Sequence, residues 1–149
     1  MGTFRVSIDI NRSTDDVFAF VAEPRNMPLW YDAVTRVTPV AAAGPTNAAR
    51  YRITRSLPTG RADNLVEVIE STSNRTVTFT SHDEPTPFDY RYAITQHDAG
   101  TRLTLDADIS SAGLPGPLAH LDAIATSAFK RGMQRNLEEL KRHVESTFR

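Results

Sequence analysis

The sequence predicts an α+β fold in which a curved antiparallel sheet of about seven strands wraps around one long C-terminal helix, with one or two short helices after the first strand. Between residues 3 and 109, apolar and polar residues alternate in short runs, which is typical of strands with one buried face. From residue 118 to 144, apolar residues recur every three or four positions, as on one face of a helix. Such a helix must bury its apolar side, and the sheet is the available partner.

The bulk composition restricts the class of protein. A chain of 149 residues suits one domain, and 17 basic against 18 acidic residues give a net charge of −1 without a basic stripe. We therefore expect no nucleic-acid partner. The absence of cysteine excludes disulfides and thiolate metal sites. The sequence contains no signal-peptide pattern and no apolar stretch of membrane-spanning length, so we expect a cytoplasmic protein without stable membrane insertion.

The N-terminal third predicts one strand followed by short helices. Residues 3–10 alternate as a half-buried strand. Ser13 and Asp16 form a variant capping box that opens a short helix, which ends before Pro24. Between Pro24 and Pro28 the chain has room only for turns or one more helical turn.

Six further strands are predicted by alternation and by turn residues between them. They span Val34–Val40, Arg50–Leu57, Asn64–Glu70, Thr76–His82, Phe88–Ile94 and Leu103–Ile109. Pro58-Thr59-Gly60 and His97–Gly100 supply turns, and Gly113–Pro117 separates the sheet from the long helix.

Three segments resemble a known family. Arg12–Trp30 carries a polar cap, a Val-Phe helix, a Pro/Asn turn and Pro-x-Trp, and Glu67–Phe79 and Asn136–Glu145 are similar to the family's central strand pair and helix terminus. The chain thus resembles the polyketide cyclase/dehydrase group of the START-like (SRPBCC) superfamily, over essentially its whole length. The resemblance implies a single START-like ligand-binding domain over residues 1–149, with a helix-grip fold.

The resemblance is compatible with several functions, because members of the superfamily include lipid and sterol carriers, polyketide aromatases and cyclases, and co-chaperone domains. We favour binding or transport of a hydrophobic small molecule (a lipid, polyketide-like or aromatic compound). The first alternative is an enzyme of the cyclase, dehydrase or aromatase type, and the second is a protein-interaction module of the co-chaperone type. In each case we expect no cofactor.

The expected site is an apolar cavity of about 300–1,000 Å³ between the sheet and the long helix. We predict that Phe79, Tyr90, Tyr92, Phe129 and Met133 line it. The complete set of candidate ligand-binding residues is Trp30, Tyr51, Ile53, Arg55, Phe79, Tyr90, Tyr92, Phe129, Met133 and Asn136.

Arg55 is the most informative candidate. It shares a strand face with Tyr51, Ile53 and Leu57, which are apolar or aromatic. A buried guanidinium is costly without compensation. Arg55 therefore has an anionic protein partner, binds an anionic ligand, or extends to solvent at the rim of the sheet.

Tyr51, Tyr90 and Tyr92 fall on inner faces by the same alternation. Their hydroxyl groups would orient or polarise a ligand carbonyl, or else bond to the backbone in ordinary core packing. The resemblance places Trp30 at the wall or mouth of the cavity, although structural packing explains it equally well.

Gly132 and Asn136 lie on the same helix face as Phe129 and Met133. A glycine in the middle of a helix suggests a close approach of the backbone to the sheet or a ligand, and Asn136 needs polar partners if it is buried.

The four histidines do not form a catalytic set, and no catalytic residue is assigned. His97 lies in a turn, while His120 and His143 lie near the two ends of the long helix. His82-Asp83-Glu84 is interpreted as a solvated loop rather than a metal site, because consecutive residues on extended chain point in different directions.

Overall fold

The computed structural model describes residues 2–40, 49–57, 60–72, 76–81, 87–109 and 122–147, and these residues form the predicted α+β arrangement. The strands are β1 (Gly2–Ile10), β2 (Val34–Val40), β3 (Ala49–Leu57), β4 (Gly60–Thr72), β5 (Thr76–Ser81), β6 (Phe88–His97) and β7 (Gly100–Ile109). The helices are α1 (Thr14–Val21), the 3₁₀ turn η1 (Pro24–Asn26), α2 (Met27–Trp30) and α4 (Asp122–Thr147).

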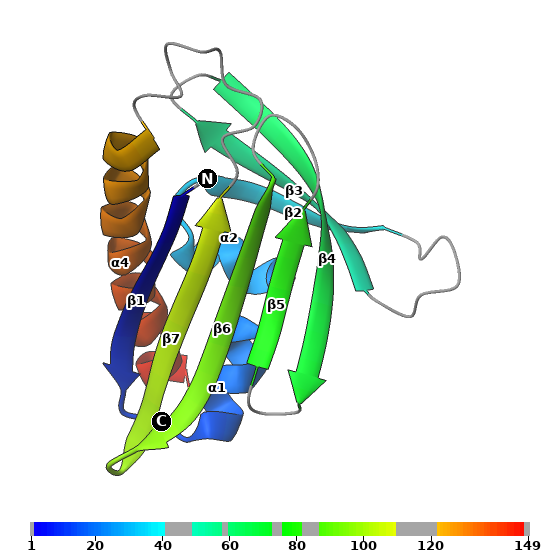
Figure 1. Cartoon of the computed structure of the whole chain (residues 1–149). Coiled ribbons are helices and arrows are strands. Elements are labelled where there is room, and N and C mark those ends of the chain that lie inside the picture. The colour runs from blue at the N-terminus through cyan, green and yellow to red at the C-terminus, as the bar shows by residue number, and fades with distance from the viewer. Residues whose placement is uncertain are drawn as a thin grey trace.

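The seven strands form one antiparallel sheet in the order β1-β7-β6-β5-β4-β3-β2. Figure 1 shows that the sheet is curved, with all the helices on one side of it. The strand β4 is longer than the alternation predicted, because it pairs with β3 down to the turn, where Leu57 lies opposite Gly60. The fold class inferred from sequence is therefore confirmed.

Helix boundaries follow the local signals in the sequence. The Ser13 hydroxyl accepts a hydrogen bond from the backbone N–H of Asp16 at 3.2 Å, so Ser13 caps α1 as predicted. The segment after Pro24 contains η1 and the single turn of α2, which is what the spacing to Pro28 allows. The expected start of the long helix at 118–121 and the Gly113–Pro117 segment lie outside the described residues.

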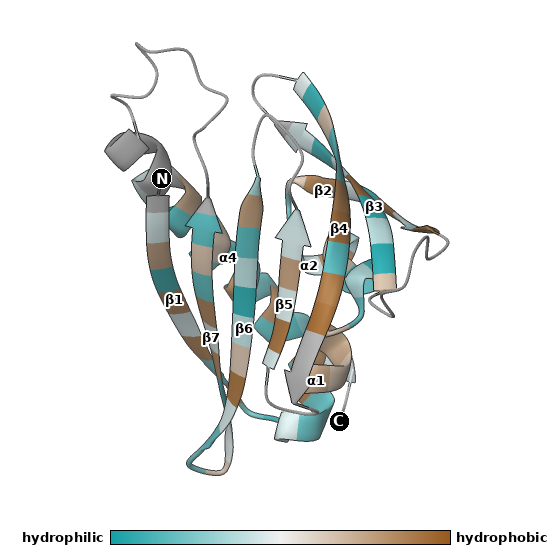
Figure 2. Cartoon of the chain, turned by 45° about the vertical axis from the view of Figure 1, so that its right-hand side comes forward, coloured by the Kyte–Doolittle hydropathy of each residue, from teal (hydrophilic) through white to brown (hydrophobic). Residues whose placement is uncertain are grey.

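The core lies between the sheet and the helices. Along β6, Phe88, Tyr90, Tyr92 and Ile94 are buried, whereas Asp89 and Arg91 are exposed. Figure 2 shows the resulting alternation of hydrophobic and hydrophilic residues along the strands. The buried side of each strand faces α1, α2 and α4, so any ligand held by this core would lie on that inner face.

Polar contacts fasten the C-terminal end of α4 to the connection between β1 and α1. The backbone N–H of Asn11 donates to Glu145 Oε2 at 2.8 Å, and Lys141 Nζ donates to the carbonyl oxygen of Asp9 at 2.6 Å. Arg12 also donates to the carbonyl oxygen of Glu145. The hydrogen bond from Asn11 is the main cause that lowers the pKa of the Glu145 carboxyl. These contacts hold one end of α4 against β1, which is its principal packing partner.

The structure does not support a close backbone approach at Gly132. A Cβ atom added there would meet, among the described residues, only the guanidinium of Arg135 at 3.9 Å, which is ordinary contact distance. The expectation that Gly132 brings the helix against the sheet is therefore wrong, and an approach to a ligand there stays a prediction.

Gly132→Ala is accordingly expected to raise the free energy of unfolding by about 0.5–1 kcal/mol, because alanine has the higher helix propensity and finds open space. Urea unfolding followed by circular dichroism measures this difference. A destabilised variant would indicate a packing role for Gly132 that its surroundings do not reveal.

Candidate functional site

A chain of buried polar side chains crosses the inner face of β3, β4 and β5. Arg55 Nη2 donates to Asn64 Oδ1 at 2.7 Å, and Asn64 Nδ2 donates to Ser81 Oγ at 3.0 Å. The three side chains belong to residues that are only 5%, 2% and 2% exposed. Neighbouring strands place them side by side, because Asn64 lies opposite Ile53, two residues before Arg55 on the same face.

The Arg55 guanidinium also lies over the ring of Phe88, with its central carbon 5.4 Å from the ring centroid. This is within the range of a cation–π interaction, which is stronger where water is excluded. The side chain is thus buried on the inner face, as the alternation predicted, and does not extend to solvent at the rim. Asn64 is a polar partner that holds it there.

A small hollow lies beside Arg55 on the inner face. Its volume is about 10 Å³, which is room for about one water molecule. It is lined by Met27, Tyr31, Val34, Ile53, Arg55, Phe88 and Tyr90.

This hollow is smaller than the predicted cavity of about 300–1,000 Å³, whose size and lining stay a prediction. Of the five predicted lining residues, Tyr90 lines the hollow. Phe79 and Tyr92 are fully buried and Met133 is 2% exposed, so these three are close-packed core. Phe129 is half-buried against the same core.

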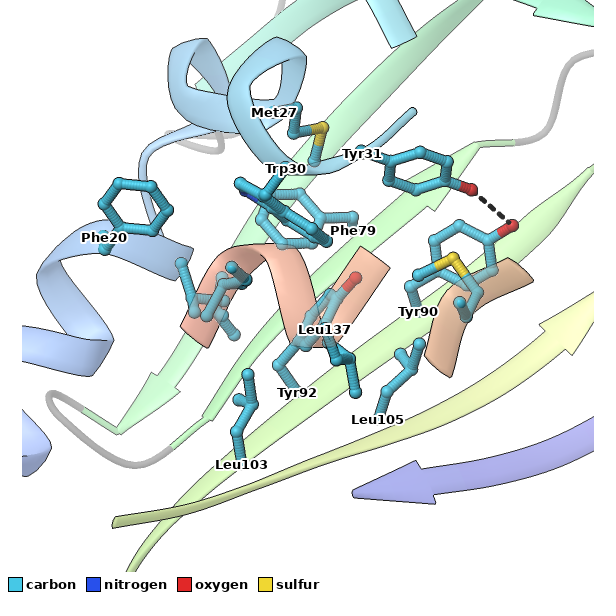
Figure 3. Packing of buried hydrophobic residues seen from close by; sticks show 14 of the residues in the cluster. Phe20, Met27, Trp30, Tyr31, Phe79, Tyr90, Tyr92, Leu103, Leu105 and Leu137 are labelled. Atoms are coloured by element: carbon cyan, nitrogen blue, oxygen red, sulfur yellow. Dashed lines mark hydrogen bonds between the residues drawn. The ribbon is translucent and has the colours of Figure 1, made fainter. Parts of the chain in front are cut away.

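The physical reason is that side chains from the α2 turn occupy the inner face. The Trp30 ring meets the Tyr92 ring edge-on at 6.1 Å, and Tyr92 meets Phe79 in the same way at 5.7 Å. Figure 3 shows Met27, Trp30 and Tyr31 of this segment lying over the sheet residues. Trp30 is 2% exposed, so it is a core residue here and does not line the hollow.

Three tyrosines of the inner face have hydroxyl groups in one region. Tyr31 and Tyr90 place their hydroxyl oxygens 3.5 Å apart, a long contact in which Tyr31 donates (Figure 3). Burial is the main cause that raises the pKa of Tyr31, and it raises the pKa values of Tyr90 and Tyr92 well above the ordinary value. All three phenols therefore stay protonated at neutral pH and act there as hydrogen-bond donors.

The remaining candidate ligand-binding residues are Ile53, Tyr51 and Asn136, and their surroundings differ. Ile53 is 3% exposed and lines the hollow, whereas Tyr51 is half-buried and lies outside it. Asn136 is buried on α4, where its Oδ1 accepts the backbone N–H of Asp32 at 3.1 Å. This bond ties α4 to the connection between α2 and β2, so Asn136 has a structural task that the helix periodicity did not indicate.

Sequence reasoning did not identify Met27, Tyr31, Asn64, Ser81 and Phe88 as members of this region. Alternation would have found three of them, because Asn64 shares a face with Val66, Phe88 with Tyr90 and Ser81 with Phe79. Tyr31 and Met27 come from short helical turns, where no periodicity indicates which side is buried.

Metal-ligating groups do not gather in the described part of the chain. No three His, Cys, Asp or Glu residues there are arranged to hold a metal ion. His97 lies near Asp9 and Asp98 at 3.7 and 3.5 Å, on the hairpin between β6 and β7. His120 and the His82-Asp83-Glu84 loop lie outside the described residues. No described helix is long and apolar enough to cross a membrane.

Solved structures of other proteins share this fold. An aligned structure from Thermus thermophilus has a TM-score of 0.83 at 15% identity, with 99% of each chain covered. A START superfamily protein from Mycobacterium smegmatis has a TM-score of 0.79 at 13% identity, with 98% of this chain and 99% of that one covered. These similarities show a shared START-like helix-grip fold.

A third similar structure is the di-domain ARO/CYC BexL from the BE-7585A biosynthetic pathway. It has a TM-score of 0.70 at 21% identity, and the alignment covers 97% of this chain but 47% of that one. No curated protein sequence matches the chain. Residues 1–145, however, match the family model described as polyketide cyclase/dehydrase and lipid transport, and the chain therefore belongs to that family.

Proposed function

We propose that the protein binds a hydrophobic small molecule on the inner face of its sheet, beside Arg55. The observation that carries this proposal is Arg55, a residue that is 5% exposed and is among those that line an apolar hollow. Burying a charge among apolar side chains gains little stability. A few fixed polar groups in an otherwise apolar site are typical of ligand pockets.

The guanidinium is already oriented before any ligand arrives. Asn64 accepts one of its hydrogen bonds, Ser81 accepts a bond from Asn64, and Phe88 lies beneath the charged group. Side chains held by such contacts lose little conformational entropy on binding, and this favours affinity.

The chemistry of the site favours an apolar ligand with one anionic or strongly accepting group. A guanidinium recognises carboxylates and similar oxygens through paired, charge-assisted hydrogen bonds. Tyr31 and Tyr90 are also among the residues that line the hollow, and their protonated hydroxyls are neutral hydrogen-bond donors. The family description, which includes lipid transport, supports the same class of ligand.

Binding requires the hollow to widen, because about 10 Å³ holds no more than a water molecule. Met27 is suited to such a change, since methionine side chains are unbranched and repack easily. The half-buried Phe129 on α4 is a second side chain whose displacement would open the inner face.

Titration with the neutral fluorescent probe N-phenyl-1-naphthylamine tests the proposal. We expect saturable binding at one site by the wild-type protein and displacement of the probe by palmitate. Ile53→Phe adds bulk to the wall of the hollow and is expected to weaken probe binding at least about tenfold, or about 1.4 kcal/mol.

Ile69→Phe is the matched control, because Ile69 lies on the adjacent strand and is 47% exposed. It should bind the probe like the wild type. Thermal unfolding of both variants shows that they are folded. Absence of saturable binding by the wild type, or equal binding by Ile53→Phe, would contradict the proposal.

An enzyme of the cyclase or dehydrase type is the second candidate, favoured by the pairing of Arg55 with two protonated phenols. A guanidinium stabilises the negative charge of an enolate, and a phenol donates to it. Among the described residues, those that line the hollow include no carboxylate and no imidazole to act as a general base. Mass spectrometry of a poly-β-keto thioester incubated with the protein tests this candidate. Arg55-dependent loss of one water, as expected when an enolate carbon attacks a ketone of the same chain and the resulting β-hydroxyl is eliminated, would support it.

A further inference from the structure

Tyr92 differs from the other inner-face tyrosines in its hydrogen bonding. Its hydroxyl is fully buried and has no hydrogen-bond partner among the described residues, whereas Tyr31 and Tyr90 contact each other. An unsatisfied buried hydroxyl costs about 1–3 kcal/mol. Phenylalanine would pack the same space without that cost, so the hydroxyl at this position calls for an explanation beyond packing.

The position of Tyr92 gives it a defined relation to Arg55. Arg55 lies over Phe88, and the next inner-face residues along β6 are Tyr90 and Tyr92. At about 3.4 Å per residue, Tyr92 lies roughly 7 Å beyond Tyr90 and roughly 14 Å beyond Phe88 along the strand. Figure 3 shows the Tyr92 hydroxyl directed toward the region that holds Tyr31 and Tyr90.

The surroundings of the Tyr92 hydroxyl favour an uncharged ligand group over an ionised one. Burial and the neighbouring Tyr31 hydroxyl both raise the pKa of Tyr92, which keeps the phenol neutral. The side chains around it are apolar or aromatic, and transfer of an ionised group into such surroundings is costly. Tyr92 thus offers a neutral hydrogen-bond donor with apolar walls.

Tyr92 is packed in the core next to the hollow and does not line it, so a ligand reaches its hydroxyl only when the hollow widens along β6. We propose that, on such widening, Tyr92 is a specificity-determining residue that donates a hydrogen bond to an uncharged oxygen, a ketone or hydroxyl, in the interior of the ligand. This inference rests on the proposed function. The ligand class that follows is an elongated apolar molecule with an acidic group at Arg55 and a neutral oxygen on the order of 10 Å further along.

Competition binding with three synthetic fatty acids tests the inference. The ligands are stearate, 10-oxostearate and 16-oxostearate, each displacing N-phenyl-1-naphthylamine from the wild type, Tyr92→Phe and Tyr51→Phe. We expect the wild type to prefer 10-oxostearate over stearate about tenfold, the effect of one satisfied buried hydrogen bond. Tyr92→Phe should lose this preference and still bind stearate, and Tyr51→Phe, altered outside the hollow, should keep it.

The outcomes separate the inference from the function on which it rests. If the wild type binds none of the three acids, the proposed function fails. If it binds stearate and 10-oxostearate equally, or prefers the 16-oxo isomer, the proposed function stands and the role of Tyr92 is wrong. A preference for 10-oxostearate that survives in Tyr92→Phe would also overturn it. The wild-type comparison remains decisive if that variant does not fold.

Discussion

Phe79→Ala is expected to lower the free energy of unfolding by about 3–5 kcal/mol, the usual cost of removing a fully packed phenylalanine. Phe79 is 0% exposed and its ring meets Tyr92 edge-on at 5.7 Å. Deleting it leaves a space between β5, β6 and the helices that the surrounding core cannot close. This is the largest stability effect that we expect from any single side chain on the inner face.

Phe129→Ala serves as the comparison, because Phe129 belongs to the same cluster but is only half-buried. Its loss is expected to cost clearly less than that of Phe79, since its contacts are already incomplete. It should also weaken binding of hydrophobic probes more than it disturbs folding. Urea unfolding of both variants measures the difference. A full core-sized loss in Phe129→Ala would identify Phe129 as core and not as a residue displaced by a ligand.

Arg55→Met is expected to weaken binding of a fatty acid by about 1.5–3 kcal/mol, the scale of a hydrogen bond to a charged group. Methionine keeps much of the side-chain length and removes the charge. Binding of the corresponding methyl ester should change little, because it has no anionic group for the guanidinium to recognise. Calorimetric titration of palmitic acid and methyl palmitate into both proteins measures the two effects.

The control for charge alone is Arg52→Met, on the same strand but exposed on the outer face. It should leave both affinities unchanged. Arg55→Met also removes the donor to Asn64, so thermal unfolding must show that the variant is folded before its affinities are compared. Equal losses for acid and ester, or none for either, would show that Arg55 has a structural role only.

Local patterns were sufficient to predict the elements of this protein. Period-two alternation located the strands, the Ser13 cap located α1, and spacing of three and four located α4. These signals are reliable because each depends on neighbours along the chain and on one boundary between core and solvent. The same alternation placed Arg55 on the inner face.

Which residues make up the candidate site depended on the tertiary structure. The alternation of β3 indicates that Arg55 points inward. Asn64 and Phe88 contact it from two other strands, and Ser81 bonds to Asn64 from a third. Which of many inward side chains become neighbours depends on strand register and twist, and neither is encoded in any single strand.

The size of the hollow was also decided by the tertiary structure. The sequence indicates which side chains face inward, but not how their summed volume compares with the space between sheet and helices. Met27, Trp30 and Tyr31, in and directly after the α2 turn, lie over the inner face and are buried there. The sequence by itself thus determined the fold and the direction of Arg55. Only the tertiary structure decided that this hollow is small and that Phe79, Tyr92 and Met133 are buried in the core, because close packing depends on three-dimensional contacts between segments distant in the chain.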